Sequence, residues 1–245
     1  LKVSDDGSGI AREELPLALA RHATSKIASL EDLEQVASLG FRGEALASIA
    51  AVSRLMLASK HNGDKHAWSI NAEGPQLSTP SPTALSAGTT VEVHDLYFNT
   101  PARRKFLKSE NTEYAHCEEA FLRIALSSPS VSFTLQHNGR VRFRLKAQSR
   151  DERIMALLGD TFDGQSLAVD EPGAEIALRG RIGSPSASRA TRDAQYFYVN
   201  GRFVRDKLLA HAVRQAYQDV LHHERHPRSE EHTSELQSRF GISYA

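Results

Sequence analysis

The order of hydrophobic and polar positions along the chain predicts helices that alternate with paired strands. Apolar side chains recur at helical spacing over 14–22, 43–52 and 114–126. Shorter helices are predicted over 30–38, 102–108, 153–158 and 207–220, and strands over 54–59, 68–72, 89–94, 131–136, 141–145, 166–169, 174–182, 196–199 and 202–204. Paired strands with helices over one face make an α+β fold.

Asn-Gly pairs predict where strands turn back on themselves. They occur at 62–63, 138–139 and 200–201, each between two predicted strands. The polar stretch 147–152 interrupts this rhythm, which then restarts. We therefore expect one domain over 1–147 and a second over 148–227.

Both ends of the chain depart from this pattern. Leu1 falls directly inside an apolar strand-like segment, so we expect that native sequence precedes it. Residues 228–245 lose all apolar periodicity and resemble the translation of a sequencing-library adapter, so we expect a non-native tail; a polar disordered tail is the alternative.

Composition narrows the classes of function. The 245 residues are 40% hydrophobic and 24% charged, and no apolar run approaches the roughly 20 residues of a membrane span. Formal net charge is zero, so any binding to nucleic acid must come from local basic patches. Cys117 is the only cysteine, which excludes an intrachain disulfide and a thiolate metal site, and we expect it to fill the core.

Two glycines and an arginine lie where a loop turns into a helix, in the run 39–46. Gly40 and Gly43 permit backbone conformations that are closed to other residues, so peptide N–H groups there can converge on a phosphate. A helix cap or tight turn is the alternative interpretation.

Three further runs have compositions that suit a nucleotide. Asp5, with Gly7 and Gly9 after it, places a carboxylate and a permissive backbone at a strand end, where adenine can be held; a plain Asp-Gly turn is the alternative. Thr24, Ser25 and Lys26 offer hydroxyls and a cation that can cover a triphosphate, or simply end a helix. The run 88–93 leads from a glycine into a strand whose threonines can line a pocket.

Taken in this order, the runs resemble the GHKL ATPase superfamily, and within it the MutL family of DNA mismatch repair proteins. The segments that carry the closer resemblance are 18–27, 39–53, 99–107 and 198–202. The resemblance covers nearly all of 1–227. It implies a Bergerat ATP-binding sandwich without its N-terminal helix, followed by a truncated α/β domain like domain 2 of ribosomal protein S5.

The resemblance also implies a cofactor, ATP with Mg²⁺, and a role for each residue of the runs. Asp5 would recognise adenine over a floor shaped by Gly7 and Gly9, with Thr90 near the base. The lid would contain Thr24, Ser25 and Lys26. The phosphates would be surrounded by Gly40, Phe41, Arg42, Gly43, Glu44, Ala45 and Leu46.

Several groups that the family needs for hydrolysis are not in this sequence. The general-base glutamate and the asparagine that holds Mg²⁺ belong to a helix before the Asp5 strand, and a phosphate-binding lysine belongs beyond Pro227. We therefore assign no catalytic residue and no metal ligand, and expect this chain not to hydrolyse ATP.

For the whole protein, the resemblance implies an ATP-dependent homodimeric clamp on double-stranded DNA. It would couple a mismatch-recognition protein to a downstream helicase or endonuclease, in the bacterial cytoplasm at the nucleoid and away from membranes. The expected DNA contacts are Arg202, Arg205, Lys207 and Arg214. A non-catalytic DNA-binding or dimerisation module, or another GHKL ATPase, is the alternative.

Overall fold

The computed structural model describes residues 1–21, 43–159, 165–173, 176–184, 195–218 and 229–234. The chain divides into two compact units, Leu1–Lys108 and Ser109–Ala245. The domain boundary predicted from the sequence, after 147, lies 39 residues later. The units divide earlier because helix α5 (Glu110–Ser127) packs with the elements that follow it: the Tyr198 hydroxyl donates to the Arg123 carbonyl at 2.8 Å.

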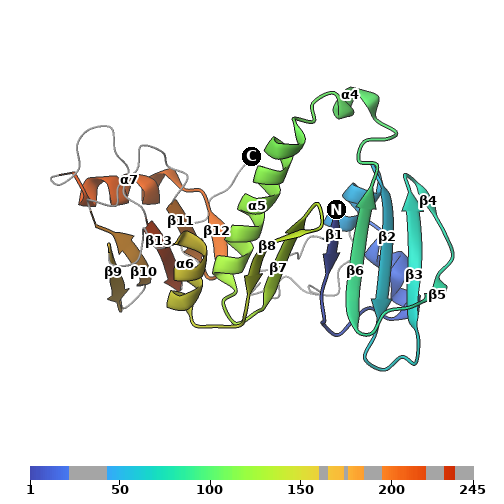
Figure 1. Ribbon diagram of the computed structural model, residues 1–245, viewed down its shortest axis with the longest axis horizontal. Coiled ribbons are helices and arrows are strands. Elements are labelled where there is room, and N and C mark those ends of the chain that lie inside the picture. The colour runs from blue at the N-terminus through green and yellow to red at the C-terminus, as the bar shows by residue number, and fades with distance from the viewer. Residues whose placement is uncertain (22–42, 160–164, 174–175, 185–194, 219–228, 235–245) are drawn as a thin grey trace. The chain divides into compact units, whose positions relative to one another are not determined.

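The first unit is built on a twisted sheet of six strands (Figure 1). Its order is β1-β6-β2-β3-β4, and β5 also pairs with β3. All pairings are antiparallel, and the register places Ser4 opposite Thr90 and Leu57 between Val91 and Ile70. The strands are β1 (Lys2–Ser4), β2 (Arg54–Lys60), β3 (Ala67–Glu73), β4 (Gln76–Leu77), β5 (Ser81–Thr83) and β6 (Gly88–His94).

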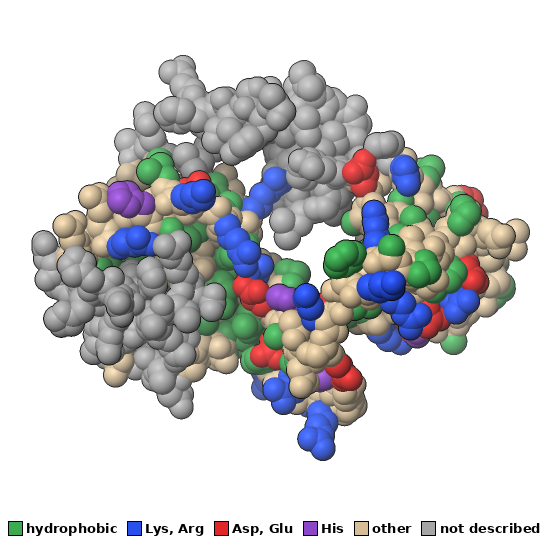
Figure 2. Space-filling model, turned by 90° about the horizontal axis from the view of Figure 1, so that it is seen from above, with side chains coloured by type: hydrophobic (Ala, Val, Ile, Leu, Met, Phe, Trp, Pro, Cys, Tyr) green, Lys and Arg blue, Asp and Glu red, His purple; other side chains and the backbone are tan. Residues whose placement is uncertain are grey.

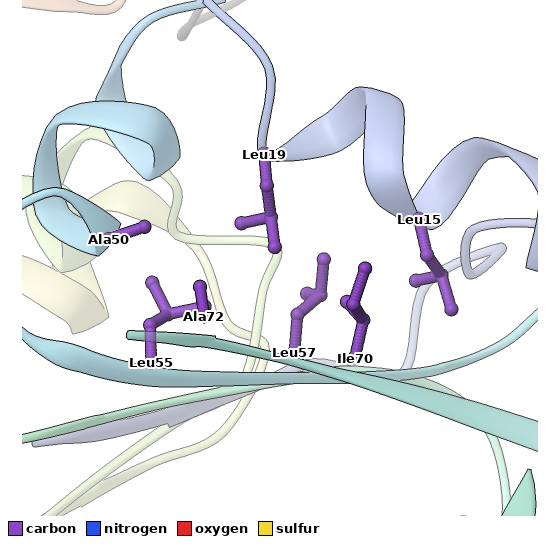
Figure 3. Close-up of a cluster of buried hydrophobic side chains, with 7 residues drawn as sticks. All are labelled: Leu15, Leu19, Ala50, Leu55, Leu57, Ile70 and Ala72. Carbon is purple, nitrogen blue, oxygen red and sulfur yellow. The ribbon is translucent and has the colours of Figure 1, made fainter. Parts of the chain in front are cut away.

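Helices cover one face of this sheet and bury a core of aliphatic side chains. They are η1 (Arg12–Glu14), α1 (Leu15–Ala18) and α3 (Ala45–Ala50). Leu15 and Leu19 point from the helical layer toward Leu57 and Ile70 on the sheet, as Figure 3 shows, and these four side chains are buried. Pro16 lies in the first turn of α1, where its missing N–H costs no hydrogen bond.

The second unit combines a long helix, a hairpin and a separate five-stranded sheet of order β12-β11-β13-β10-β9. Tyr196 and Tyr198 from β11 pack with Leu126 and Ile154 on one side, while Phe197 packs with Val213 on the other. The elements are α5, β7 (Phe133–His137), β8 (Arg140–Leu145), α6 (Arg150–Leu158), β9 (Ser166–Glu171), β10 (Ala177–Gly183), β11 (Gln195–Val199), β12 (Arg202–Val204), α7 (Lys207–Ala216) and β13 (Ser229–Ser234).

The observed architecture is α+β, as predicted, and tight hairpin turns form at two of the three predicted Asn-Gly pairs, 138–139 and 200–201, whereas the pair at 62–63 lies in the longer loop 61–66 between β2 and β3. Asn138 and Asn200 have φ of 50° and 49°, and the glycines after them also have positive φ. This left-handed pair is the conformation that a two-residue hairpin turn requires.

Several predictions from the sequence were wrong in detail. Cys117 is exposed on α5 and does not fill the core, because the buried side of that helix runs through Ala125 and Leu126 near its end. The helix predicted over 102–108 is a single turn, α4 (Pro101–Arg104). Strand β13 was not predicted, because its polar sequence has no strand pattern and we expected 228–245 to be a tail outside the fold. Its backbone nevertheless pairs with β10 and β11. The helix predicted over 30–38 lies outside the described residues.

Candidate functional site

The loop after β1 is tied to the neighbouring strand β6 through Asp5. The Asp5 N–H donates to the Thr89 carbonyl at 2.8 Å. Its side-chain oxygen Oδ1 accepts from the N–H groups of Gly7, at 2.9 Å, and of Thr89, at 3.2 Å. No described residue donates to the second oxygen, Oδ2. The carboxylate is therefore fixed through one oxygen while the other, on an exposed side chain, faces no protein donor.

Two glycines make this arrangement possible by close backbone approach. Gly9 has a φ of 72°, and a Cβ there would lie 2.0 Å from the Lys60 carbonyl oxygen. Gly88 has a φ of 70°, and its Cβ would lie 2.0 Å from the Asp5 carbonyl oxygen. Any side chain at either position would push the loop away from the sheet.

A buried hydroxyl joins the segments of the site. Ser59, which is fully buried, accepts from the Ile10 N–H at 2.7 Å and donates to the Gly88 carbonyl at 3.1 Å. It also lies 2.9 Å from the Thr89 hydroxyl, and the Ser4 and Thr90 hydroxyls form a second such pair at 2.9 Å. Thr90 is thus bonded to Ser4, the residue before Asp5, and its position near the base stays a prediction. Ser59 was missed because a serine inside an apolar strand carries no motif.

The other side of the expected nucleotide site is described only in part. Gly43 has a φ of 63°, and Glu44 is the N-cap residue of α3, so the helix begins at Ala45 rather than near Gly43. Leu46 is partly buried and packs against the core of the first unit. Thr24, Ser25, Lys26, Gly40, Phe41 and Arg42 lie outside the described residues. The structure therefore describes the residues expected at the adenine end, and the roles of all these residues in nucleotide binding stay predictions.

A metal site is not assembled by the part of the chain that the structure describes, where no three His, Cys, Asp or Glu side chains cluster. We assign no Mg²⁺ ligand to it. Within the same described ranges, every helix is too short or too polar to cross a bilayer.

Basic side chains surround a cavity of about 620 Å³ in the second unit. It lies where α5, the β11–β12 hairpin and the start of α7 meet, and three of the four predicted DNA contacts line it: Arg205, Lys207 and Arg214. The fourth, Arg202, starts β12 and is not part of the lining. Figure 2 shows Lys and Arg side chains exposed over this part of the second unit.

The hairpin and the helix hold these cations in place. Asp206 caps α7 by accepting from the Leu208 and Leu209 N–H groups at 2.8 and 2.9 Å, which fixes where Lys207 begins the helix. Arg214 lies two turns later on the same helix. Neither Lys207 nor Arg214 forms an ion pair with a described residue, so both can receive an anion.

Two lining residues escaped prediction because they come from α5, far away in sequence. Arg123 stacks on Phe203, with its guanidinium carbon 4.4 Å from the ring centroid. Glu119 pairs with Arg123 one helical turn later and also with Arg205 at 3.2 Å. An Arg four residues after a Glu is the ordinary pattern of a helix surface, and nothing in the sequence shows that Arg205 joins the pair.

Comparison with known proteins gives these sites a context. A family model described as "DNA mismatch repair protein, C-terminal domain" matches residues 154–229. The chain is 58% identical over 227 residues to the DNA mismatch repair protein MutL of Thiobacillus denitrificans, covering 93% of this chain and 38% of that protein. It is 54% identical over 222 residues to MutL of Neisseria meningitidis, covering 91% of this chain and 34% of that protein. The chain thus spans less than two-fifths of the length of these relatives.

Two solved structures of DNA repair proteins are similar to this chain. The Aquifex aeolicus MutL ATPase domain complexed with ADP is 28% identical, with a TM-score of 0.66 over 97% of this chain and 80% of that one. An N-terminal domain of a DNA repair protein matches with a TM-score of 0.79 over 99% of this chain and 76% of that one. At 21% identity, the second match bears on the fold alone.

Proposed function

Because this chain belongs to the MutL family of DNA mismatch repair proteins and has the fold of its GHKL ATPase domain, we propose that its first unit binds the adenine of ATP. Its second unit contacts the backbone of double-stranded DNA. In the whole protein, ATP binding closes a homodimeric clamp that couples a mismatch-recognition protein to a helicase or endonuclease. The protein acts in the bacterial cytoplasm, on nucleoid DNA.

One observation carries the nucleotide part of this proposal. Asp5 is held through Oδ1 by two backbone donors, which leaves Oδ2 to accept from the exocyclic amine of adenine. The similar Aquifex aeolicus domain is complexed with ADP, so a nucleotide fits this fold. Gly7 has no side chain beside the carboxylate, where a Cβ would lie 3.0 Å from Asp5 Oδ1, so a flat ring can approach there.

In this proposal, the protein's own residues bind ATP and orient its adenine and phosphates. Asp5 selects adenine by its hydrogen bond, and Ser59 keeps the loop and β6 at a fixed spacing. Lys26 and Arg42 would neutralise phosphate charge in the segment that the structure does not describe. Bound ATP would supply the γ-phosphate that orders this segment. Mg²⁺ would accompany the phosphates, and its ligand is not assigned to this chain.

An isosteric change tests the proposal. In Asp5→Asn, the amide oxygen stays with the two backbone donors and the amide nitrogen then faces the adenine amine, donor against donor. We expect ATP affinity, measured by titration calorimetry on the full chain, to fall about tenfold to a hundredfold. Asp6→Asn makes the same change of charge one residue away, on a side chain without a described partner, and should stay within about twofold.

Equal affinities for the two variants, or wild-type protein that does not bind ATP, would refute the nucleotide part. A DNA-binding module that holds ATP weakly is the second candidate, favoured by the cations that line the cavity. It predicts salt-sensitive binding to duplex DNA that Asp5→Asn leaves unchanged and Arg214→Glu weakens.

A further inference from the structure

The cavity of the second unit has an excess of positive charge. Its lining contains four permanent cations, Arg123, Arg205, Lys207 and Arg214, and two carboxylates, Glu119 and Asp206. Asp206 is engaged as the cap of α7. Glu119 is therefore the single lining carboxylate that is free to move among these cations.

The Glu119 carboxylate lies between two arginines of the cavity, as a bound anion would. One of its oxygens, Oε1, accepts from Arg123 on its own helix and from Arg205 between β12 and α7, the latter at 3.2 Å. The Glu119 side chain is 39% exposed and that of Arg205 72% exposed, so solvent and solutes reach the pair. An ion pair this accessible is weak and exchanges readily with a stronger anion.

Arg123 offers more donors than Glu119 uses. Its Nε is buried and has no acceptor among the described residues. The guanidinium group stacks on the Phe203 ring and donates to Glu119 through one terminal nitrogen. Burial lowers the pKa of this group, and the charge of Arg205 lowers it further.

We propose that a phosphate of the DNA backbone takes the place of Glu119 between Arg123 and Arg205, and that Glu119 is an internal competitor that weakens DNA binding. The inference rests on the proposed contact between the second unit and DNA. A phosphodiester presents two charged oxygens and can accept from both guanidinium groups at once. Glu119 holds the two arginines in position while DNA is absent and swings out when a phosphate arrives.

The test compares two variants with the same change of charge on the same helix. Glu119→Gln frees Arg123 and Arg205, whereas Glu110→Gln removes a carboxylate that bonds Asn138 at 2.7 Å, far along α5 from the cavity. Binding of a fluorescent DNA duplex is followed by anisotropy at several salt concentrations. We expect Glu119→Gln to bind about two- to fivefold more tightly than wild type, and Glu110→Gln to change affinity by less than about twofold. The slope of log Kd against log salt should also steepen by up to about one for Glu119→Gln.

A second substitution, Arg205→Gln, tests whether the gain in affinity comes from the Glu119–Arg205 pair or from the change in net charge alone. With Glu119 present, Arg205 is already neutralised, so Arg205→Gln should weaken binding only slightly. In Glu119→Gln, the added Arg205→Gln should abolish the gain, which makes the two changes non-additive. Thermal unfolding monitors the fold, and Glu119→Asp, whose shorter side chain reaches Arg205 less well, should give a smaller gain if Glu119→Gln does not fold.

The failures are distinguishable. If wild type does not bind the duplex, or Arg214→Glu leaves binding unchanged, the proposed DNA contact is wrong. If wild type binds and Arg214→Glu weakens it, but Glu119→Gln and Glu110→Gln behave alike, the role of Glu119 alone is wrong. If Glu119→Gln binds inorganic phosphate more tightly in calorimetry but does not bind DNA more tightly, the proposed role of Glu119 is also wrong, because the cavity would then bind free phosphate.

Discussion

At the scale of single residues, the second unit depends on a buried arginine that pairs with no carboxylate among the residues that the structure describes. Arg153 has no exposed surface, and its guanidinium lies 5.4 Å from the centre of the Phe133 ring. Its donors reach four backbone carbonyls at 2.7–3.0 Å, those of Ala125, Pro129, Val131 and Lys146. These carbonyls end α5 and flank the β7–β8 hairpin, so one side chain satisfies the turns around it.

We expect Arg153→Met to lower the free energy of unfolding by about 3–5 kcal/mol, because it leaves buried carbonyls without donors. Arg150→Met, an exposed arginine in the first turn of the same helix, should change it by less than about 0.5 kcal/mol. Urea unfolding of both variants measures the difference. Similar stabilities would mean that water replaces the guanidinium at little cost.

At the scale of elements, the glycines of positive φ fall into two kinds. Gly139 lies in a hairpin turn, and a Cβ there would meet nothing within 4 Å. Gly88 begins β6, and its Cβ would strike the backbone of Asp5. Gly139→Ala should therefore cost only the left-handed conformation, about 1–2 kcal/mol, whereas Gly88→Ala should cost about 2–5 kcal/mol because the strand or the loop must also shift.

Denaturant unfolding and ATP titration together check this pair. Gly88→Ala should also weaken ATP binding, since Asp5 moves with the loop. Gly139→Ala belongs to the other unit and should leave ATP binding unchanged. Equal losses of stability would show that the loop yields to a methyl group without strain.

Helix α6 begins with a capping box that gives its stability a pH dependence. The carboxylate of Glu152 accepts from the Ser149 hydroxyl at 2.7 Å and from the Ser149 N–H at 2.8 Å. Both bonds lower the pKa of Glu152 below its ordinary 4.5, and the bond from the Ser149 hydroxyl contributes more than the bond from the Ser149 N–H. A group whose pKa is lowered by folding stabilises the folded state above its unfolded pKa, and this contribution is lost as pH falls through the folded pKa.

Wild type should therefore be more stable than Glu152→Gln at neutral pH, and the gap should narrow as pH falls below about 4.5. Thermal unfolding of both proteins, from neutral pH to below about 4.5, measures this difference in stability. A gap that is constant with pH would mean that the uncharged amide caps the helix equally well.

At the scale of the whole molecule, the sequence predicted what local patterns encode. The Asn-Gly turns, the buried face of Leu15 and Leu19, and the carboxylate at the end of β1 all follow from spacing over a few residues. Contacts between distant segments were not predictable in this way. The meeting of Glu119 with Arg205, and of Ser59 with Ile10, depends on how helices and strands pack, which short-range spacing does not report.

The errors have the same physical origin. Helix periodicity assigned Cys117 to a buried face, but the fully buried side chains of α5 lie near its end, at Ala125 and Leu126, and Cys117 is exposed. Strand β13 pairs through backbone hydrogen bonds, which require no apolar side chains and so leave no pattern in the sequence. The boundary between compact units follows the packing of α5, whose neighbours in space come later in the chain.

The exposure of Cys117 has a practical consequence. It is the only thiol in the chain, it lies on the same helix as Glu119, and it does not line the cavity. A maleimide dye will therefore attach at one position without any engineered cysteine. This chain comes with a natural reporter site from which energy transfer to labelled DNA can be measured.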